Sequence, residues 1–246
     1  MKIIAITQAR YGSTRLPGKV LKQIDGISLL QIHISRILKS KKIDKLIVAT
    51  TFEDQSLQIA NIADDLGVKV YRGSTQDVLD RYYQTAKIEN PDWVVRITSD
   101  CPLIDSSVID KVVNYAIVHD ATYCSNVFPP TFPDGMDVEV FKFFALEDAW
   151  KNAKQPFERE HVTVYIQEKY KEKTGKYVNY ENKEDCSKYR LTVDTQEDFD
   201  LIEKLIKKLG YDKCWENYID LIKSNPELFN INNKYKRNEG YFKQDM

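Results

Sequence analysis

The sequence has little cysteine and histidine, and neither is arranged as a metal site. Its four cysteines, Cys101, Cys124, Cys186 and Cys214, form no C-x-x-C pair, and its three histidines lie far apart. Structural zinc sites need closely spaced ligand pairs, so a zinc-binding fold is not expected. Scattered thiols of this kind are typical of a reduced, cytosolic protein.

Long apolar runs and a strong excess of charge are also missing. No stretch of about 18 apolar residues predicts a membrane-spanning helix, and the amino-terminal residues do not resemble a signal peptide. The net charge is only −1, which argues against a general nucleic-acid-binding protein. With 246 residues, 42% of them hydrophobic, the chain can bury a sizeable core. We therefore expect a cytoplasmic protein that binds neither nucleic acid nor membranes.

Strand-like and helix-like segments alternate through the first half of the chain. Strands are expected at 2–6, 45–50, 69–71 and 93–98, and helices at 28–40, 55–66, 77–88 and 106–119. Repeated strand–helix units predict an α/β fold with a mostly parallel sheet and helices on both faces. The loops after residues 6, 50, 71 and 98 should then lie at one edge of the sheet, where ligands bind.

The second half of the chain is less regular. We expect strands at 136–141, 176–181 and 189–195, and helices at 157–172 and from Gln196 onward. No repeat and no linker rich in Gly, Ser or Pro divides the chain. We predict one domain over residues 1–225, with 125–185 as a candidate inserted subdomain for acceptor binding or dimerisation. Residues 226–246 read as a polar tail.

A basic loop follows the first expected strand. Arg10, Arg15 and Lys19 lie within twelve residues, QARYGSTRLPGK, together with Gly12 and Gly18. Glycines allow a close approach of the backbone to a ligand, and several backbone N–H groups with three cations would suit a triphosphate. The alternative is a solvated loop that forms surface ion pairs, and composition alone does not decide between them.

This loop is not a P-loop. That motif places four residues between its glycines and a Ser or Thr after its lysine. Here five residues separate Gly12 from Gly18, and Val20 follows Lys19. The hydroxyl that would hold magnesium in a P-loop is therefore missing.

The stretch QARYGSTRLPGKVL resembles the signature loop of the CTP-dependent nucleotidyltransferases that make CMP-sugars, such as CMP-Kdo synthetase and acylneuraminate cytidylyltransferase. The resemblance is strongest to the group called spore coat polysaccharide biosynthesis protein F. Further blocks resemble that group in order, up to about residue 200: GSTQDVLDRY, VVRITSDCPLID, DGMDVEVF, FEREHVT and YRLTVDTQEDF. The resemblance implies a single Rossmann-like, three-layer domain of the nucleotide-diphospho-sugar transferase type.

The resemblance also implies an activity. It is the Mg²⁺-dependent transfer of CMP from CTP to a sugar acid or related acceptor, with release of pyrophosphate, in surface polysaccharide or glycan biosynthesis. Such a reaction needs fixed positive charge and a metal. The matching positions assign catalysis to Arg10, Arg15, Lys19 and Asp100, and Mg²⁺ binding to Asp100 and Asp194. Each aspartate could instead be a helix N-cap.

The resemblance assigns nucleotide binding to a larger set of positions. These are Ala9, Arg10, Gly12, Ser13, Thr14, Arg15, Lys19, Ser74, Arg81 and Ser99. Asp77 lies in the same region as Ser74 and Arg81, and the alternative there is Asp77 as an N-cap and Arg81 on a solvated face. Ser99 departs from the glycine that relatives mostly carry, which would matter if the backbone there needs a positive φ.

Acceptor binding is assigned to Arg159, His161 and Glu139. The alternative for Arg159 is an ion pair with Glu158 or Glu160 on a helix. Cys101, beside Asp100, has no base partner that the sequence identifies, and we expect a packed thiol.

The sequence leaves other functions open. A sugar phosphate or polyol phosphate acceptor would give a nucleoside-diphosphate-linked product. A glycosyltransferase with a similar nucleotide domain would usually carry D-x-D, and the corresponding loop here is SDCPLID. A non-enzymatic nucleotide sensor would not need both metal-binding carboxylates. By analogy with related enzymes, we also expect a homodimer.

Overall fold

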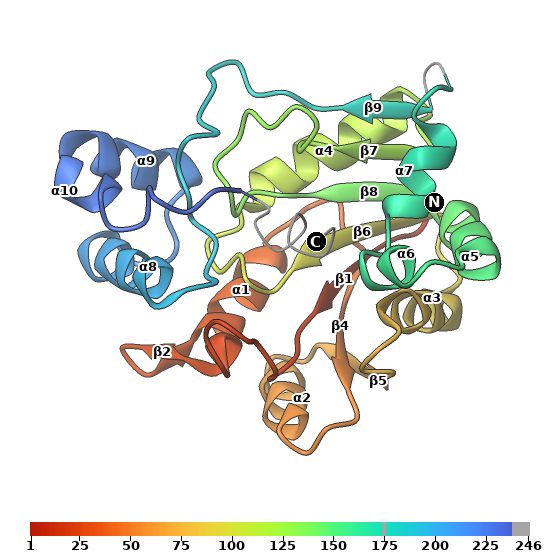
Figure 1. Ribbon diagram of the computed structural model, residues 1–246, viewed down its shortest axis with the longest axis horizontal. Coiled ribbons are helices and arrows are strands. Elements are labelled where there is room, and N and C mark those ends of the chain that lie inside the picture. Colours follow the sequence, from red (N-terminus) through yellow and green to blue (C-terminus); the bar gives the residue numbers. More distant parts are fainter. Residues whose placement is uncertain (174–175, 238–246) are drawn as a thin grey trace.

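The computed structural model describes residues 1–173 and 176–237. Within these ranges the main sheet has seven strands in the order β5-β4-β1-β6-β8-β7-β9 (Figure 1). Their bounds are β1 Ile3–Gln8, β4 Lys45–Thr51, β5 Lys69–Gly73, β6 Trp93–Thr98, β7 Tyr123–Ser125, β8 Glu139–Lys142 and β9 Tyr177–Asn179. The strands β5, β4, β1 and β6 are parallel, whereas β8 runs antiparallel to both β6 and β7. The predicted mostly parallel sheet is confirmed, with β8 as a reversed strand.

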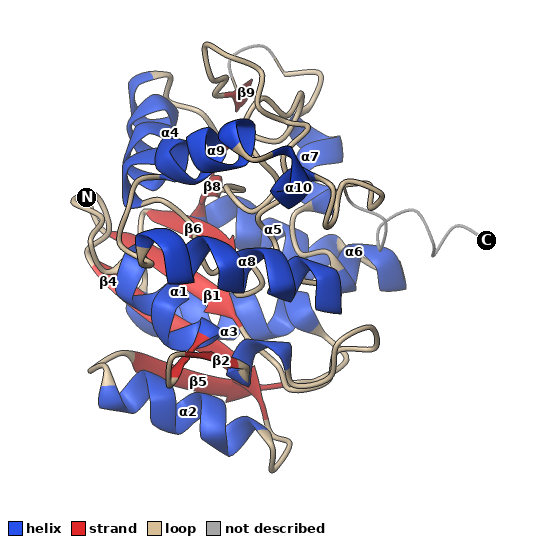
Figure 2. Cartoon of the chain, turned by 90° about the vertical axis from the view of Figure 1, so that its left-hand side faces the viewer, coloured by secondary structure: helices blue, strands red, loops and turns tan. Residues whose placement is uncertain are grey.

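Helices cover both faces of this sheet, and the three layers can be followed in Figure 2. The helices are α1 Leu29–Ile37, α2 Ser56–Asp65, α3 Val78–Glu89, α4 Ser106–Val118, α5 Phe143–Asn152, α6 Pro156–Glu160, α7 Val164–Tyr170, α8 Gln196–Leu209, α9 Trp215–Ser224 and α10 Pro226–Phe229. Ile3 and Ala5 of β1 belong to the core with α1, α2 and α4, and Ile4 and Ile6 to the core with α3, α5 and α7. Successive side chains of a strand point to opposite faces, so one apolar run supplies two cores.

Short polar signals fix where the helices begin. Ser28 caps α1, and its side chain forms a capping box with Gln31. Thr195 caps α8 in the same way with Asp198. A cap satisfies backbone N–H groups that have no partner inside the helix. These caps therefore fix where α1 and α8 begin.

Two expected elements of the second half differ in the structure. The helix expected at 157–172 is divided into α6 and α7, because Val162 between them has a positive φ of 54°. The segment expected as a strand at 189–195 is not a strand, and forms only an isolated bridge between Arg190 and Asp134. Its apolar alternation reflects burial of Leu191 and Val193 in the core, not pairing in the sheet.

The strand expected at 136–141 begins later, at Glu139. Both β8 and β9, from the candidate subdomain 125–185, belong to the main sheet. The start of the predicted polar tail, residues 226–237, contains α10 and the buried Asn232. The rest of that tail, 238–246, lies outside the described residues. No helix in the described ranges is long and apolar enough to cross a membrane.

Candidate active site

A cleft of about 1180 Å³ opens at the carboxyl edge of β1 and β6. The predicted site residues that line it are Ala9, Arg10, Gly12, Ser13, Thr14, Arg15, Lys19, Arg81, Ser99, Asp100, Glu139, His161 and Asp194. Ser74 and Arg159 are not among the described residues that line it. The parallel topology explains this convergence, because the loops that follow parallel strands meet at one edge of the sheet.

The charged groups predicted to handle phosphate and metal meet in this cleft. Lys19 Nζ donates to Asp194 Oδ1 at 2.7 Å and to Asp100 Oδ2 at 3.4 Å. Arg15 Nη2 lies 3.1 Å from Asp194 Oδ2. Gly18, with a φ of 66°, turns the loop into the short 3-10 helix Lys19–Leu21 and so brings Lys19 to this point. Side chains 175 positions apart in the sequence thus share one ion pair.

The ion pair shifts the pKa values of Asp100 and Lys19 in opposite directions. Burial alone would raise the pKa of Asp100, but the nearby Lys19 ammonium and hydrogen bonds lower this pKa to about 2. Burial works against the charged form of Lys19, and the negative charges of Asp100 and Asp194 outweigh it and raise the pKa of Lys19. At neutral pH the site therefore holds an ammonium between carboxylates.

Asp100 and Asp194 fit a magnesium ion shared with a ligand. Both carboxylates face the same Lys19 ammonium, so their oxygens are directed toward a common region. Mg²⁺ is usually held by one or two carboxylates, with phosphate oxygens and water in the remaining positions. In residues 1–173 and 176–237, no group of three or more His, Cys, Asp or Glu side chains is arranged to hold a metal ion. The donor set suits a metal that arrives with phosphate.

Neither aspartate is a helix N-cap, which was the alternative for each. Asp105 caps α4, and Thr195 caps α8. Ser99, beside Asp100, does not need the conformational freedom of glycine. The described non-glycine residues with positive φ are Asp25, Asn90, Asp120 and Val162, and Ser99 is not among them. Cys101 is the packed thiol that we expected, since burial raises the pKa of its thiol well above the ordinary value.

Arg81 is buried, contrary to the alternative of a solvated face. It is 1% exposed, and its Nη1 donates to the carbonyl of Ser74. Burial lowers the pKa of Arg81, and the positive charge of Arg10 acts in the same direction. Its Nε is buried without a hydrogen-bond partner among the described residues. Arg10 and Arg81 both line the cleft, so two arginine side chains lie at this part of its wall.

Asp77 and Arg159 have structural partners. Asp77 caps α3 by accepting from Asp80 N at 2.8 Å. Arg159 Nη2 donates to Asp77 Oδ2 at 2.6 Å, and its Nη1 donates to the carbonyl of Trp150 at 2.9 Å. Arg159 thus ties α6 to the start of α3, across 82 positions of sequence. Its acceptor role stays a prediction that this geometry does not support.

Glu139 and His161 lie in the cleft wall. Glu139 forms an ion pair with Arg96, and its Oε1 accepts from Tyr123 Oη at 2.6 Å and from Thr163 Oγ1 at 2.7 Å. Burial would raise the pKa of Glu139, but Arg96 and these hydrogen bonds lower it. The positive φ at Val162 accompanies this arrangement, since the chain turns there just before Thr163. The carboxylate is therefore a fixed part of the wall.

Several charged residues of the cleft are not among those that the sequence indicated. They include Arg96, Asp134 and Arg190. Arg96 carried a signal, because a charged residue inside an otherwise apolar strand is expected to have a buried partner. Arg190 lies four residues before Asp194, but the local sequence does not indicate that it also reaches Asp134.

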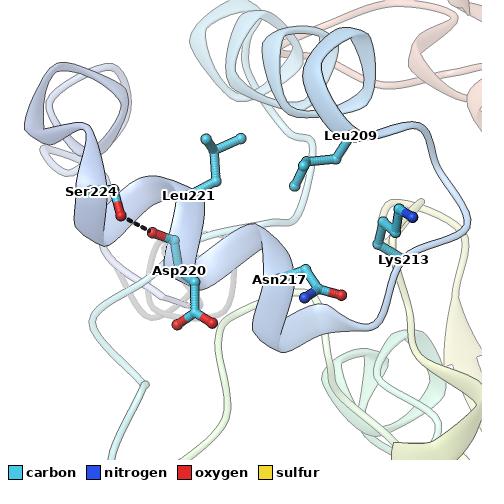
Figure 3. Close-up of a pocket in the computed structure, with 6 residues that line it drawn as sticks. All are labelled: Leu209, Lys213, Asn217, Asp220, Leu221 and Ser224. Carbon is cyan, nitrogen blue, oxygen red and sulfur yellow. Dashed lines mark hydrogen bonds between the residues drawn. The ribbon is translucent and has the colours of Figure 1, made fainter.

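A second hollow lies away from the cleft, between α8 and α9 (Figure 3). Its volume is about 380 Å³, and Figure 3 labels its lining residues: Leu209, Lys213, Asn217, Asp220, Leu221 and Ser224. The hydroxyl of Ser224 is used locally, as it donates to the carbonyl of Asp220 at 2.8 Å. The lining includes no arginine and only two charged side chains, so the large cleft is the better candidate site.

Comparison with known proteins agrees with the geometry. The sequence profile described as cytidylyltransferase matches residues 4–225. The chain is 41% identical to an uncharacterized protein of Methanocaldococcus jannaschii over 96% of this chain and 97% of that protein. It is 30% identical to the spore coat polysaccharide biosynthesis protein SpsF of Bacillus subtilis, over 92% and 95% of the two chains. The structure of a cytidylyltransferase from Leptospira borgpetersenii superimposes with a TM-score of 0.88 at 38% identity, covering 93% of this chain and 97% of that one. The predicted resemblance and fold class are confirmed.

Proposed function

This chain belongs to the cytidylyltransferase family and is a nucleotidyltransferase, and on this premise we propose that it transfers CMP from CTP to a sugar acid or related acceptor. Pyrophosphate is released, Mg²⁺ is required, and the product serves surface polysaccharide or glycan synthesis. One observation carries the proposal: Arg15, Lys19, Asp100 and Asp194 form a single ionic cluster in the cleft at the carboxyl edge of β1 and β6.

In this reaction an acceptor oxygen attacks the α-phosphorus of CTP, and the bond to the β,γ-pyrophosphate breaks. Negative charge grows on the phosphoryl oxygens and on the leaving group, so fixed cations aimed at them lower the barrier. Arg10 and Lys19 lie in the loop that reaches the cleft. In the chain without a ligand, the Lys19 ammonium is held at this point by the two carboxylates.

Asp100 and Asp194 would hold the magnesium ion. When bound, Mg²⁺ neutralises phosphate charge and orients the phosphate groups. Asp100 is ionised at neutral pH, since its pKa is lowered to about 2. The Lys19 ammonium would then leave the carboxylates to contact phosphate, which is consistent with its position between them.

The acceptor is expected beside α6 and α7, where His161, Gln167 and Lys171 line the cleft. Lys171 is a cation on this wall, whereas Arg159 is engaged with Asp77. A carboxylate or a phosphate on the acceptor would both suit a cation, so a sugar phosphate or polyol phosphate is the second candidate. The two acceptor classes differ in product: a CMP-sugar from the first and a nucleoside-diphosphate-linked compound from the second.

The first test is a thermal-shift measurement with each of the four nucleoside triphosphates, with and without Mg²⁺. We expect the largest stabilisation with CTP and Mg²⁺ together. Pyrophosphate release is then measured with CTP and panels of sugar acids, sugar phosphates and polyol phosphates. A larger shift with another nucleotide would contradict the choice of CTP, and release only with phosphorylated acceptors would favour the second candidate.

The substitution Asp100→Asn tests whether Asp100 holds the magnesium ion. It preserves the size of the side chain and removes its charge, so we expect Mg²⁺-dependent turnover to be lost while the far-UV spectrum is retained. Turnover equal to that of the unmodified enzyme would mean that Asp100 does not hold the metal.

A further inference from the structure

A largely buried ionic network adjoins the proposed metal site. Its centre is Arg190, which is 7% exposed and contacts three carboxylates. Nη1 donates to Asp134 Oδ2 at 2.6 Å, Nη2 to Asp194 Oδ2 at 3.0 Å, and Nε to Asp198 Oδ1 at 2.9 Å. A planar guanidinium with five donors in fixed directions can serve three acceptors at once, which a lysine cannot do.

The two oxygens of Asp194 are used differently. Oδ2 accepts from Arg190 and lies 3.1 Å from Nη2 of Arg15, whereas Oδ1 accepts from Lys19, on the side of Asp100. The backbone is fixed as well, since Asp194 N donates to Asp198 Oδ2 at 2.9 Å. Arg190 and Asp198 thus set the direction in which Oδ1 of Asp194 faces the site.

The segment after α10 completes the network. Asn232, which is 3% exposed, donates through Nδ2 to Asp198 Oδ1 at 2.9 Å and to the carbonyl of Arg190 at 3.2 Å. Asp198 is fully buried and accepts from Arg190, Asn232 and two backbone N–H groups. A buried carboxylate needs such complete pairing. The chain from Asn232 through Asp198 and Arg190 to Asp194 is therefore continuous.

Such a network is an expensive way to stabilise a fold. Burying several charges removes their hydration, and well-packed apolar residues of similar volume often stabilise a protein as well or better. The network does not lie in a remote part of the core but contacts a carboxylate that lines the cleft. Groups that hold a metal ligand by its second oxygen are known to tune metal affinity.

We propose that Arg190 is the positioning residue of Asp194, and that Asn232 of the carboxyl-terminal segment holds the Arg190 side chain in its orientation through Asp198. This inference rests on the proposed function, because that function makes Asp194 a metal ligand. It adds a role for a segment that the sequence alone assigned to a polar tail.

The test measures metal binding directly, with Mn²⁺ as the probe and its EPR signal as the readout, on the full chain with CTP present. Arg190→Lys keeps the positive charge but loses the planar guanidinium that serves three carboxylates. We expect Mn²⁺ to bind about 10- to 100-fold more weakly to this variant. CTP affinity in EDTA should be unchanged. Asn232→Leu should weaken Mn²⁺ binding in the same direction by a smaller factor.

Arg36→Lys is the matched control. Arg36 is an equally buried arginine, at 4% exposed, and it donates to backbone carbonyls of Ile104, Tyr211 and Lys213 outside the cleft. Its substitution should lower the melting temperature without changing Mn²⁺ affinity. If Arg190→Lys does not fold, Asn232→Leu alone decides the question.

Each result bears on the proposal. Unchanged Mn²⁺ affinity in the Arg190 and Asn232 variants would overturn it, as would weakening by the same factor in Arg36→Lys. Absence of Mn²⁺ binding to the unmodified protein would overturn it too, because Asp194 would not be a metal ligand. If Mn²⁺ binds as expected but no acceptor supports pyrophosphate release, the proposed function fails while the positioning role stands.

Discussion

Lys19 forms ion pairs with Asp100 and Asp194, and we propose that it contacts phosphate when a nucleotide binds. We expect Lys19→Ala to lower turnover by about 10²- to 10³-fold, because a fixed cation at the transition state is lost. Pyrophosphate release measures turnover, and circular dichroism checks the fold.

Lys22→Ala is the control for this substitution. Lys22 is close in the chain, but its ammonium lies over the Phe199 ring at 4.6 Å and not in the cleft. Its removal should leave turnover unchanged. Turnover of Lys19→Ala close to that of the control would take Lys19 out of the phosphate site.

His33 is a buried residue whose contribution to the free energy of unfolding depends on pH. Its Nδ1 donates to the carbonyl of Cys101 at 2.8 Å, and its Nε2 lies 2.8 Å from Thr7 Oγ1. Burial lowers the pKa of His33 from 6.5 to about 4. Below pH 6.5 the unfolded chain takes up a proton that the folded protein refuses. The free energy of unfolding should therefore fall as the pH drops from 6.5 toward 4, by on the order of 3 kcal/mol in total.

His33→Gln removes this titration. The difference in melting temperature between pH 7 and pH 5 should be smaller in the variant than in the unmodified protein. Equal pH dependence in both would show that His33 does not remain neutral in the folded state.

At the scale of elements, the segment 189–195 depends on one glycine. Gly135 has a φ of 106°, and a Cβ built on it would lie 2.7 Å from Leu191 C and Thr192 N. The contact is with backbone, which cannot rotate away. Gly135→Ala should therefore destabilise the protein by roughly 3 kcal/mol and shift the segment that carries Asp194. The measurements are urea unfolding and the half-saturating CTP concentration.

Gly26→Ala is a control that separates the cost of a positive φ from the cost of the clash between the added Cβ and the backbone. Gly26 has a φ of 82° in the turn between β2 Gln23–Ile24 and β3 Ile27–Ser28, but no atom lies within 4 Å of its added Cβ. It should show only the backbone penalty, about 1 kcal/mol, with normal CTP use. Equal effects of the two variants would mean that the contact with residues 191–192 is unimportant.

At the scale of the whole molecule, we predict that two chains associate. The homodimer is a prediction by analogy with related enzymes. β9 is the last strand of the main sheet, and in the described residues its outer edge has no partner strand. Such an edge is usually covered. Light scattering behind a sizing column at about 10 µM should give twice the chain mass of 28.7 kDa. A single-chain mass at that concentration would contradict the prediction.

The sequence by itself determined the alternating elements of the first half and the place of the basic loop. These depend on local signals: apolar periodicity, the Ser28 cap, and glycines such as Gly67, which has a φ of 69° just after α2. Parallel strands then require the loops after β1 and β6 to meet, so the loops that carry Lys19 and Asp100 were expected at one edge of the sheet. The family motifs added Asp194.

Only the tertiary structure decided which distant charges are partners. Arg159 faces Asp77 and not its helical neighbours, Arg190 joins Asp134 to Asp198, and Asn232 closes the network from the carboxyl-terminal segment. Contacts between distant residues also explain why the helix is broken at Val162 and why no strand forms at 189–195. Burial and ion pairing over long sequence separations outweigh local propensity, and a local pattern contains no information about which remote group will lie beside it.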